Sequence, residues 1–242
     1  MQNAPRHHKP ARLYSLEPLP EAALRLGHLV ARQHADLEQI AAVIGSDPEL
    51  TQRLLRLANP RATSPQNFAV RTIEEALLRT GLGCALLLAM SQPLKAAIEN
   101  TFAFMARIPL VSVDPAQLLP LRGLHLKGTI RFVGKAEGRV EFRISPYAAR
   151  WLTGAVLAIP VREVRAPDIV SDTVAEMLNI VTGGFKSNLC NVGLSCRLDP
   201  PQVAETDEIH WSTAPQGCHE WMAFQAAAFK MFVALVVNPW AG

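Results

Sequence analysis

The chain has 242 residues, of which 49% are hydrophobic and 19% charged, and its formal net charge is +3. This length allows one large core or two modest ones, and the composition excludes a disordered chain. The basic residues are scattered, except for a group at Arg6, His7, His8, Lys9 and Arg12. A mild charge of this kind gives no reason to expect a nucleic-acid partner, so we interpret residues 1–14 as a disordered basic tail.

The four cysteines, Cys84, Cys190, Cys196 and Cys218, lie far apart in the sequence and include no CxxC pair. This spacing suggests neither a zinc site nor a disulfide framework, and it fits a reducing compartment best. The apolar runs are too short to span a bilayer, and the polar N-terminus lacks the apolar segment of a signal peptide. We therefore expect a cytoplasmic protein with no membrane partner.

Residues 15–92 have the periodicity of short helices. Apolar side chains recur every three or four residues over 20–32, 36–44, 48–58 and 72–79. The four segments begin at residues typical of helix starts, namely Pro20, Asp36, Ser46-Asp47-Pro48, and Thr72 with Glu75 as a capping box. The sequence therefore predicts an N-terminal helical module over residues 15–92.

Residues 93–242 combine both kinds of element. We expect helices over 93–107 and 147–157, a long helix over 167–189, and a hairpin of two strands over 124–133 and 139–144. In the second of these strands Val140, Phe142 and Ile144 alternate with Arg139, Glu141 and Arg143. Further strand-like segments are 193–198 and 209–213, and 221–237 holds at least one strand, although its alanine-rich part is also compatible with a helix. The order predicts an α+β fold with two long helices packed on an antiparallel sheet.

A family resemblance appears in the N-terminal helices. The segment LPEAALRLGHLVARQHADLEQIAAVIGSDPELTQRLLRLAN, followed by RTIEEALLRTGLG, resembles the opening of an HDOD domain. That helical signalling module is related to HD phosphohydrolases but lacks their metal ligands. The resemblance covers residues 16–90, about half of a complete module, which implies a truncated copy. The chain contains no His-Asp dipeptide, which argues against a metal-dependent HD hydrolase. From the residues alone, a plain helical packing module is an equally good description.

The long helix over 167–189 has two distinct faces. An apolar stripe is formed by Val170, Val174, Met177, Leu178, Val181 and Phe185. Opposite it, Asp172, Glu176, Asn179 and Gly183 follow one another at intervals of four, three and four residues. Any surface helix has polar residues opposite its core face, so a solvated face is the simplest interpretation. Asn179 and the pair Gly183-Gly184, however, disfavour a helix, and they are typical of a surface that another backbone approaches closely.

A second resemblance involves this same helix. The run DTVAEMLNIVTGGFKSNLCNVGLSCRLDPPQV, in its order of elements, resembles the CheC, CheX and FliY phosphatases, which remove phosphate from response-regulator receiver domains. Their motif has Asp or Ser four residues before Glu, Asn three residues after it, and a later proline where the next strand begins. Asp172, Glu176 and Asn179 match, and Pro201 falls one position short of the usual spacing. A single motif is present, as in CheX.

The resemblance implies a role for each residue. Asn179 orients the attacking water and Glu176 reaches the receiver's active-site lysine, whereas Asp172, Gly183 and Lys186 belong to the partner-binding surface. The partner is a phosphorylated CheY-like receiver, whose magnesium ion serves the reaction, so this chain needs no cofactor or metal of its own. A homodimer is also possible. The division is then 1–14 tail, 15–92 HDOD-like module and 93–242 CheX-like phosphatase domain.

Two other hypotheses stay open. The first is a non-catalytic adaptor or scaffold in two-component or chemotaxis signalling, which docks a receiver through the same helix without hydrolysis. The second is a structural or dimerisation module whose polar helix face is only solvated.

Overall fold

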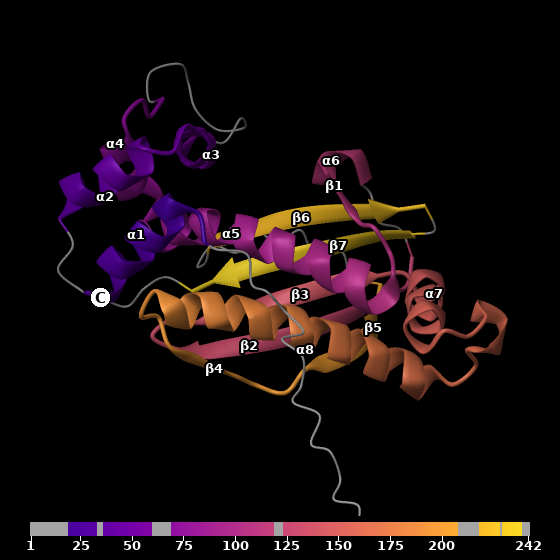
Figure 1. The fold of residues 1–242 in the computed structure, drawn as a ribbon. Coiled ribbons are helices and arrows are strands. Elements are labelled where there is room, and N and C mark those ends of the chain that lie inside the picture. Colours follow the sequence, from indigo (N-terminus) through magenta and orange to yellow (C-terminus); the bar gives the residue numbers. More distant parts are fainter. Residues whose placement is uncertain are drawn as a thin grey trace, which may run out of the picture.

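The structure is a computed structural model that describes residues 19–32, 36–59, 69–118, 123–207, 218–227 and 229–238. The expected tail at 1–14 and the expected strand at 209–213 lie outside these residues. Figure 1 shows short helices gathered at one end of an extended sheet, and two long helices lying along one face of it. The architecture is the α+β arrangement that the sequence predicts.

The short helices confirm the four predicted segments. They are α1 (Glu21–Ala31), α2 (Leu37–Gly45), α3 (Pro48–Ala58) and α4 (Ile73–Thr80). The side chains of Asp36, Asp47 and Thr72 each accept a hydrogen bond from a backbone N–H in the first turn of the helix that follows. These bonds satisfy N–H groups that have no partner inside the helix, and they fix where the helices begin.

Helix α5 (Leu82–Thr101) is longer than expected. The sequence predicted a helix from Pro93, but the observed helix begins eleven residues earlier and contains Pro93 in its interior. Strong helix formers and nearly complete burial over 83–91 override the effect of the proline. A π-helical turn, η1 (Phe102–Ala106), continues it. Among the described residues no single helix is long and apolar enough to cross a membrane, and the pair formed by α4 and α5 with η1 bends by 102°.

The sheet is antiparallel throughout, with the strand order β1-β6-β7-β3-β2-β4 and with β5 also paired to β2. Its strands are β1 (Val111–Val113), β2 (His125–Gly134), β3 (Gly138–Ile144), β4 (Cys196–Leu198), β5 (Gln202–Thr206), β6 (Cys218–Ala226) and β7 (Phe229–Val237), and the short helix α6 (Pro115–Leu118) follows β1. The ambiguous segment 221–237 is therefore a hairpin of two strands. Pairing with β1 on one side and β3 on the other outweighs the helical tendency of its alanines.

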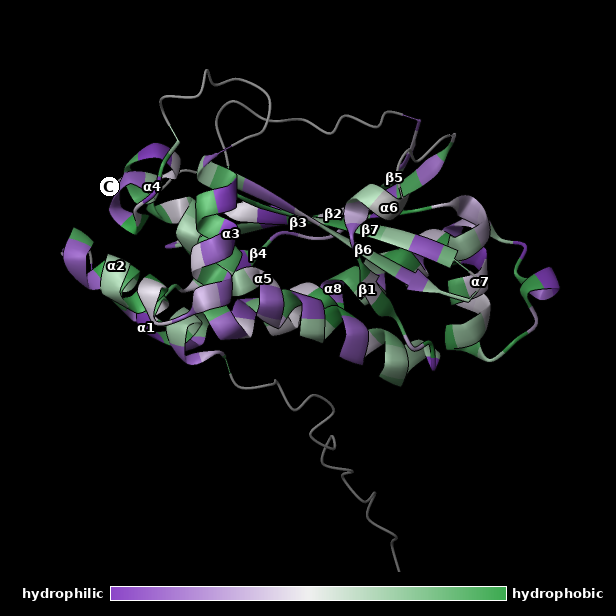
Figure 2. Ribbon diagram, turned by 90° about the horizontal axis from the view of Figure 1, so that it is seen from above, coloured by the Kyte–Doolittle hydropathy of each residue, from purple (hydrophilic) through white to green (hydrophobic). Residues whose placement is uncertain are grey.

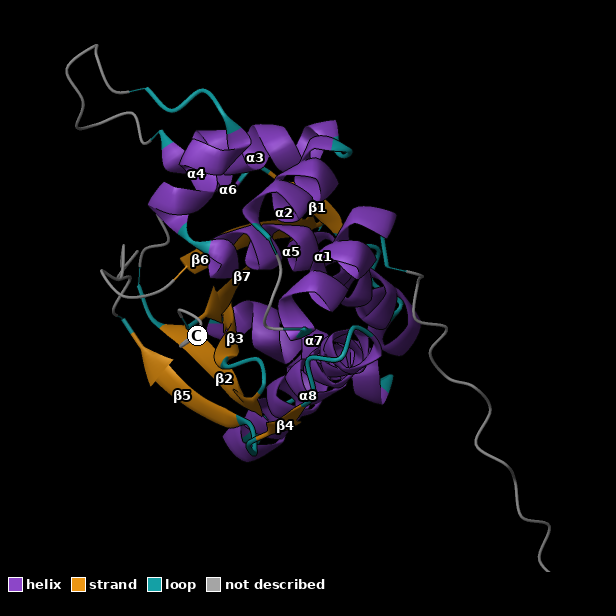
Figure 3. Ribbon diagram, turned by 90° about the vertical axis from the view of Figure 1, so that its left-hand side faces the viewer, coloured by secondary structure: helices purple, strands orange, loops and turns teal. Residues whose placement is uncertain are grey.

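Three further helical segments complete the fold: α7 (Pro146–Leu157), the 3₁₀ turn η2 (Val161–Glu163) and α8 (Pro167–Asn191). Figure 3 shows the helices on one side of the sheet. Helix α8 crosses β2 at Gly128, where an added Cβ would lie 3.1 Å from the side chain of Leu178 and 3.4 Å from that of Val174. The missing side chain therefore lets α8 lie close to the sheet, and the interlocked core holds the helix in a fixed position.

The face of the sheet turned away from α8 carries a buried charge cluster. As the alternation predicted, Arg139, Glu141 and Arg143 point away from Val140 and its apolar neighbours. The Glu141 carboxylate accepts a hydrogen bond from Arg139 Nε at 2.6 Å and lies 3.4 Å from an Arg143 nitrogen. The Arg143 guanidinium also lies 5.5 Å from the ring centroid of Trp221. Burial of Glu141 is thus compensated by two cations.

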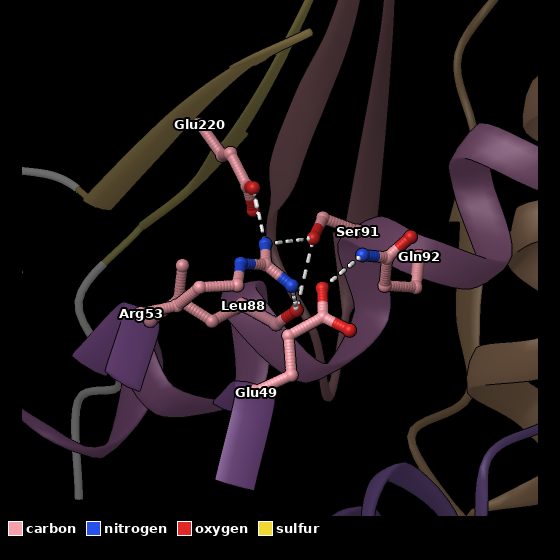
Figure 4. A network of polar contacts seen from close by, with 6 residues as sticks. All are labelled: Glu49, Arg53, Leu88, Ser91, Gln92 and Glu220. Carbon is pink, nitrogen blue, oxygen red and sulfur yellow. Dashed lines mark hydrogen bonds and ion pairs between the residues drawn. The ribbon is translucent and has the colours of Figure 1, made fainter. Parts of the chain in front are cut away.

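A polar network joins the N-terminal helices to the sheet (Figure 4). The guanidinium of Arg53 on α3 donates to Ser91 Oγ on α5 and to Glu220 Oε1 on β6. The second oxygen of Glu220 is buried and has no hydrogen-bond partner among the described residues. Burial raises the pKa of Glu220, and the nearby Arg53 opposes that rise only in part. This contact connects the N-terminal helices to the sheet. The two also share one hydrophobic core cluster, whose members range from Ala22 to Val237.

The cysteine pairing is a correction to the sequence analysis. Cys84 on α5 and Cys218 on β6 form a disulfide, with their Cα atoms 5.1 Å apart and a sequence separation of 134 residues. The wide spacing concealed the pair, because only the tertiary fold brings α5 beside β6. Cys190 and Cys196 are free. The wide spacing of the cysteines therefore no longer supports the inference of a reducing compartment.

Candidate functional site

Helix α8 places the sequence-predicted site residues on one exposed stripe. All six residues of the predicted apolar face are buried, whereas Asp172, Glu176 and Asn179 are exposed. Figure 2 shows hydrophilic and hydrophobic segments alternating along the helix. With 3.6 residues per turn, the five predicted positions 172, 176, 179, 183 and 186 fall within a sector of about 80° and extend over about 21 Å of helix. The side chains thus form one continuous strip.

Glu176 and Asn179 have no competing partner in the described parts of the chain. No hydrogen bond or ion pair occupies either side chain there, and the same is true of Asp172. A carboxylate and an amide one turn apart, on a helix anchored by its buried face, are therefore free to contact another molecule. Their positions are set by the backbone and not by neighbouring side chains.

Gly183 and Lys186 extend the strip toward the C-terminal end of α8. A Cβ placed at Gly183 would meet nothing within 4 Å, so a second molecule can approach the backbone at this position. The carbonyl of Gly183 accepts a hydrogen bond from Ser187 Oγ at 3.0 Å. Lys186 is only partly exposed, and its charge acts on Cys196 in β4, where it lowers a thiol pKa that burial and Cys190 raise.

A groove that the sequence analysis missed lies beside Asp172 and Glu176. It has a volume of about 290 Å³ and lies where η1, α7 and the first turns of α8 meet. Its other lining residues are Met105, Val156, Leu157, Ile169, Thr173 and Met177. Ile169 was one indication in the sequence, because it is apolar but lies off the apolar stripe of α8. Met105 reaches the groove through a π-helical turn that no sequence pattern marks.

The chemistry available on this strip is that of orientation and charge. An amide holds a water through its oxygen or its nitrogen without adding negative charge, and a carboxylate accepts a bond from a cation. Among the described residues no group of three or more His, Cys, Asp or Glu could hold a metal ion. A larger hollow of about 480 Å³, lined by Arg25, His28 and Arg32 among others, belongs to α1 and α2. In Figure 1 these two helices lie at the other end of the molecule from α7.

Comparisons with known families agree with the two resemblances. The model of the family described as "Chemotaxis phosphatase CheX" matches residues 126–224, and the model of the HDOD domain matches residues 16–110. The chain carries an HDOD-like region followed by a CheX-like domain. A comparison with curated proteins gave no match. Helix α5 runs through the boundary expected at residues 92/93, which stays a prediction.

Solved structures show the same fold for the CheX-like domain. The chemotaxis protein CheX from Vibrio vulnificus aligns with a TM-score of 0.53 and 23% identity, over 62% of this chain and 96% of that one. A CheC-like superfamily protein from Shewanella sp. PV-4 aligns at 0.52 and 19%, over 62% and 97%. A complex of CheX with CheY, BeF₃ and Mg²⁺ from Borrelia burgdorferi aligns at 0.50 and 16%, over 62% and 97%.

The CheX match includes α8 and therefore all five predicted site residues. The proline of the sequence motif also has a structural position, because Pro201 immediately precedes β5, which pairs with β2 beneath α8. The one-residue difference in motif spacing thus leaves the proline at the start of a strand.

Proposed function

We propose that this chain binds the phosphorylated receiver domain of a response regulator and hydrolyses its aspartyl phosphate. The observation that carries the proposal is the pair Glu176 and Asn179, exposed one turn apart on an anchored helix of a CheX-like domain and without partners in the described chain. The BeF₃ and Mg²⁺ complex of a CheX with CheY supports a receiver as the class of partner.

In the proposed reaction, the receiver supplies most of the electrostatic stabilisation. Its magnesium ion and lysine neutralise the phosphoryl oxygens, so the phosphatase has mainly to position a water in line with the scissile bond. The water oxygen forms a bond to phosphorus as the bond from phosphorus to the aspartyl oxygen breaks. Aspartate and inorganic phosphate result, and the water's proton passes to phosphate or solvent.

Asn179 and Glu176 have different roles in this mechanism. The Asn179 amide holds the attacking water without placing a negative charge beside the phosphate, which a carboxylate in its place would do. Glu176 contacts the receiver's lysine through a charge-assisted hydrogen bond and fixes the docked geometry. Asp172, Gly183 and Lys186 contribute to the contact surface around them.

The experiment is the decay of receiver acyl phosphate, measured for the wild type and for Glu176→Ala and Asn179→Ala. Glu74→Ala and Asn191→Ala are matched controls, because both are exposed helical residues outside the strip. Acceleration that is lost in the two strip variants and kept in the two controls supports the phosphatase. Binding of receiver without acceleration favours the adaptor, and neither binding nor acceleration favours a structural module.

A further inference from the structure

The groove beside Glu176 is mainly apolar, although it is open to solvent. Leu157 on α7 and Ile169 on α8 are 48% and 45% exposed, and both line it. Thr173 adds little polarity, because its hydroxyl donates to the carbonyl of Ile169 at 2.8 Å. Exposed aliphatic side chains that line an open groove leave apolar surface in water, which a partner can cover.

The charged side chains that line the groove are acidic. They are Asp172 and Glu176, and no other described residue of the lining is charged. Asp168 lies exposed in the first turn of the same helix. The chemistry that fits is therefore an apolar side chain carried next to a cation on the partner's surface.

The position of the groove relative to the strip sets a distance. Ile169 precedes Glu176 by seven residues, or about 10 Å along the helix at 1.5 Å per residue. Because Glu176 also lines the groove, a partner that contacts Glu176 with a lysine presents its apolar side chain within about this distance of that lysine. Ile169 and Glu176 both lie on α8, so the two contacts act together in setting the orientation of the bound partner.

We propose that this groove, formed by Met105, Val156, Leu157, Ile169 and Met177, is a docking pocket for an apolar side chain on the receiver's surface near its active-site lysine. This inference rests on the proposed function and adds to it the contact that selects among receivers. A receiver with an apolar residue at that position binds, whereas one with an acidic residue is repelled by Asp172 and Glu176.

The test uses the double variant Leu157→Ser/Ile169→Ser in the 242-residue chain. Neither residue is part of the proposed water-positioning machinery. The control Leu78→Ser changes a leucine on α4 that is 77% exposed. A conservative variant, Leu157→Met/Ile169→Leu, keeps the apolar surface. Circular dichroism and urea unfolding establish that each variant folds.

Two readouts separate docking from chemistry. Binding is titrated against a receiver activated with BeF₃⁻ and Mg²⁺, and acyl-phosphate decay is followed over a range of receiver concentrations. We expect the serine double variant to bind about 10- to 100-fold more weakly, because two apolar contacts are lost. KM rises in proportion and kcat stays within about twofold, while the control and the conservative variant resemble the wild type.

Each outcome bears on one of the two proposals. Unchanged binding by a folded serine variant overturns the docking pocket, as does a lower kcat with an unchanged KM. A wild type that binds no activated receiver of its organism also overturns it. A wild type that binds receiver but does not accelerate decay refutes hydrolysis, while the binding titration still decides the groove.

Discussion

A substitution at Gly183 should affect the stability of α8 and its proposed docking role in opposite directions. An added Cβ would meet nothing within 4 Å, and alanine favours a helix over glycine by about 1 kcal/mol. Gly183→Ala should therefore raise the free energy of unfolding by about 0.5–1 kcal/mol in urea titrations. The same variant should slow receiver dephosphorylation, because the new methyl group keeps the receiver away from the helix. Higher stability with unchanged activity would remove Gly183 from the contact surface.

At this scale the sequence predicted the strip but not the groove. The exposure of Asp172, Glu176 and Asn179 follows from the 3.6-residue period, because six apolar residues fix which face of the helix is buried. The groove depends on where α7 and η1 end relative to α8. The π-helical turn that positions Met105 shifts the helix register, and the sequence FAFMA has no feature that distinguishes it from an α-helical turn.

Among the elements, α3 contacts β6 through the ion pair of Arg53 with Glu220. Because burial raises the pKa of Glu220, the folded protein binds a proton there more readily than the unfolded chain. The contribution of Glu220 to the free energy of unfolding is therefore largest at pH values below the ordinary carboxyl pKa. It declines as the pH rises through the raised pKa of Glu220 in the folded protein. Arg53 reduces this loss at neutral pH.

We predict that Arg53→Met destabilises the protein by about 2–3 kcal/mol at pH 8, because it removes the ion-pair partner of a largely buried carboxylate. The loss should be smaller at pH 5, where Glu220 is more readily protonated. Urea unfolding at the two pH values measures both effects. The double variant Arg53→Met/Glu220→Leu should recover most of the lost stability, since it removes the orphaned charge. Equal losses at both pH values would contradict this explanation.

Helix α1 packs against the chain just after α8 through a glycine. A Cβ at Gly27 would lie 2.6 Å from both Cβ and Cγ2 of Val192. Helix propensity alone predicts that Gly27→Ala stabilises by about 1 kcal/mol, but overpacking costs about 1–3 kcal/mol, so we expect net destabilisation. The double variant Gly27→Ala/Val192→Ala should lose less than the sum of the two single variants. A Gly27→Ala protein more stable than the wild type would show that the helices move apart without cost.

For the elements, the sequence predicted the structure well where the apolar periodicity was clear. It predicted less where contacts with other elements determine whether a segment is a helix or a strand. The capped helices α2, α3 and α4 followed from local signals at Asp36, Asp47 and Thr72. For 221–237 the sequence predicted at least one strand but not the hairpin of β6 and β7, because pairing with β1 and β3 decides the fate of the alanine-rich part. The early start of α5 was also missed, since a proline usually indicates a helix boundary.

For the molecule as a whole, the disulfide joins α5 to β6 across a loop of 134 residues. Closing so long a loop restricts the unfolded chain, and disulfides of this kind typically contribute about 2–4 kcal/mol. We expect dithiothreitol, or Cys84→Ala/Cys218→Ala, to lower the free energy of unfolding by that amount in urea titrations. Cys190→Ala, at an exposed free cysteine, is the control. An identical free energy of unfolding with and without reductant would show that the disulfide does not contribute to stability.

The sequence also did not predict that the HDOD-like region and the CheX-like domain share one hydrophobic core. One core cluster includes residues from Ala22 to Val237. Helix α5 lies within the HDOD match, and it packs against α8 and β6 of the CheX-like domain. The two resemblances each describe a local stretch of chain, whereas the contacts of Arg53 with Glu220 and of Gly27 with Val192 join residues more than 160 positions apart. Sequence patterns indicate local periodicity, and they do not predict contacts between residues so far apart in the chain.

The central claim is that Asn179 orients the attacking water on a docked receiver. The most direct measurement compares wild type and Asn179→Ala for binding to a BeF₃⁻-activated receiver and for the rate of acyl-phosphate decay at saturating receiver. We predict that kcat falls about 100-fold or more, as for loss of one transition-state contact, while Kd and the free energy of unfolding stay nearly unchanged. A variant that retains wild-type kcat, or one whose entire loss is in Kd, would contradict the claim.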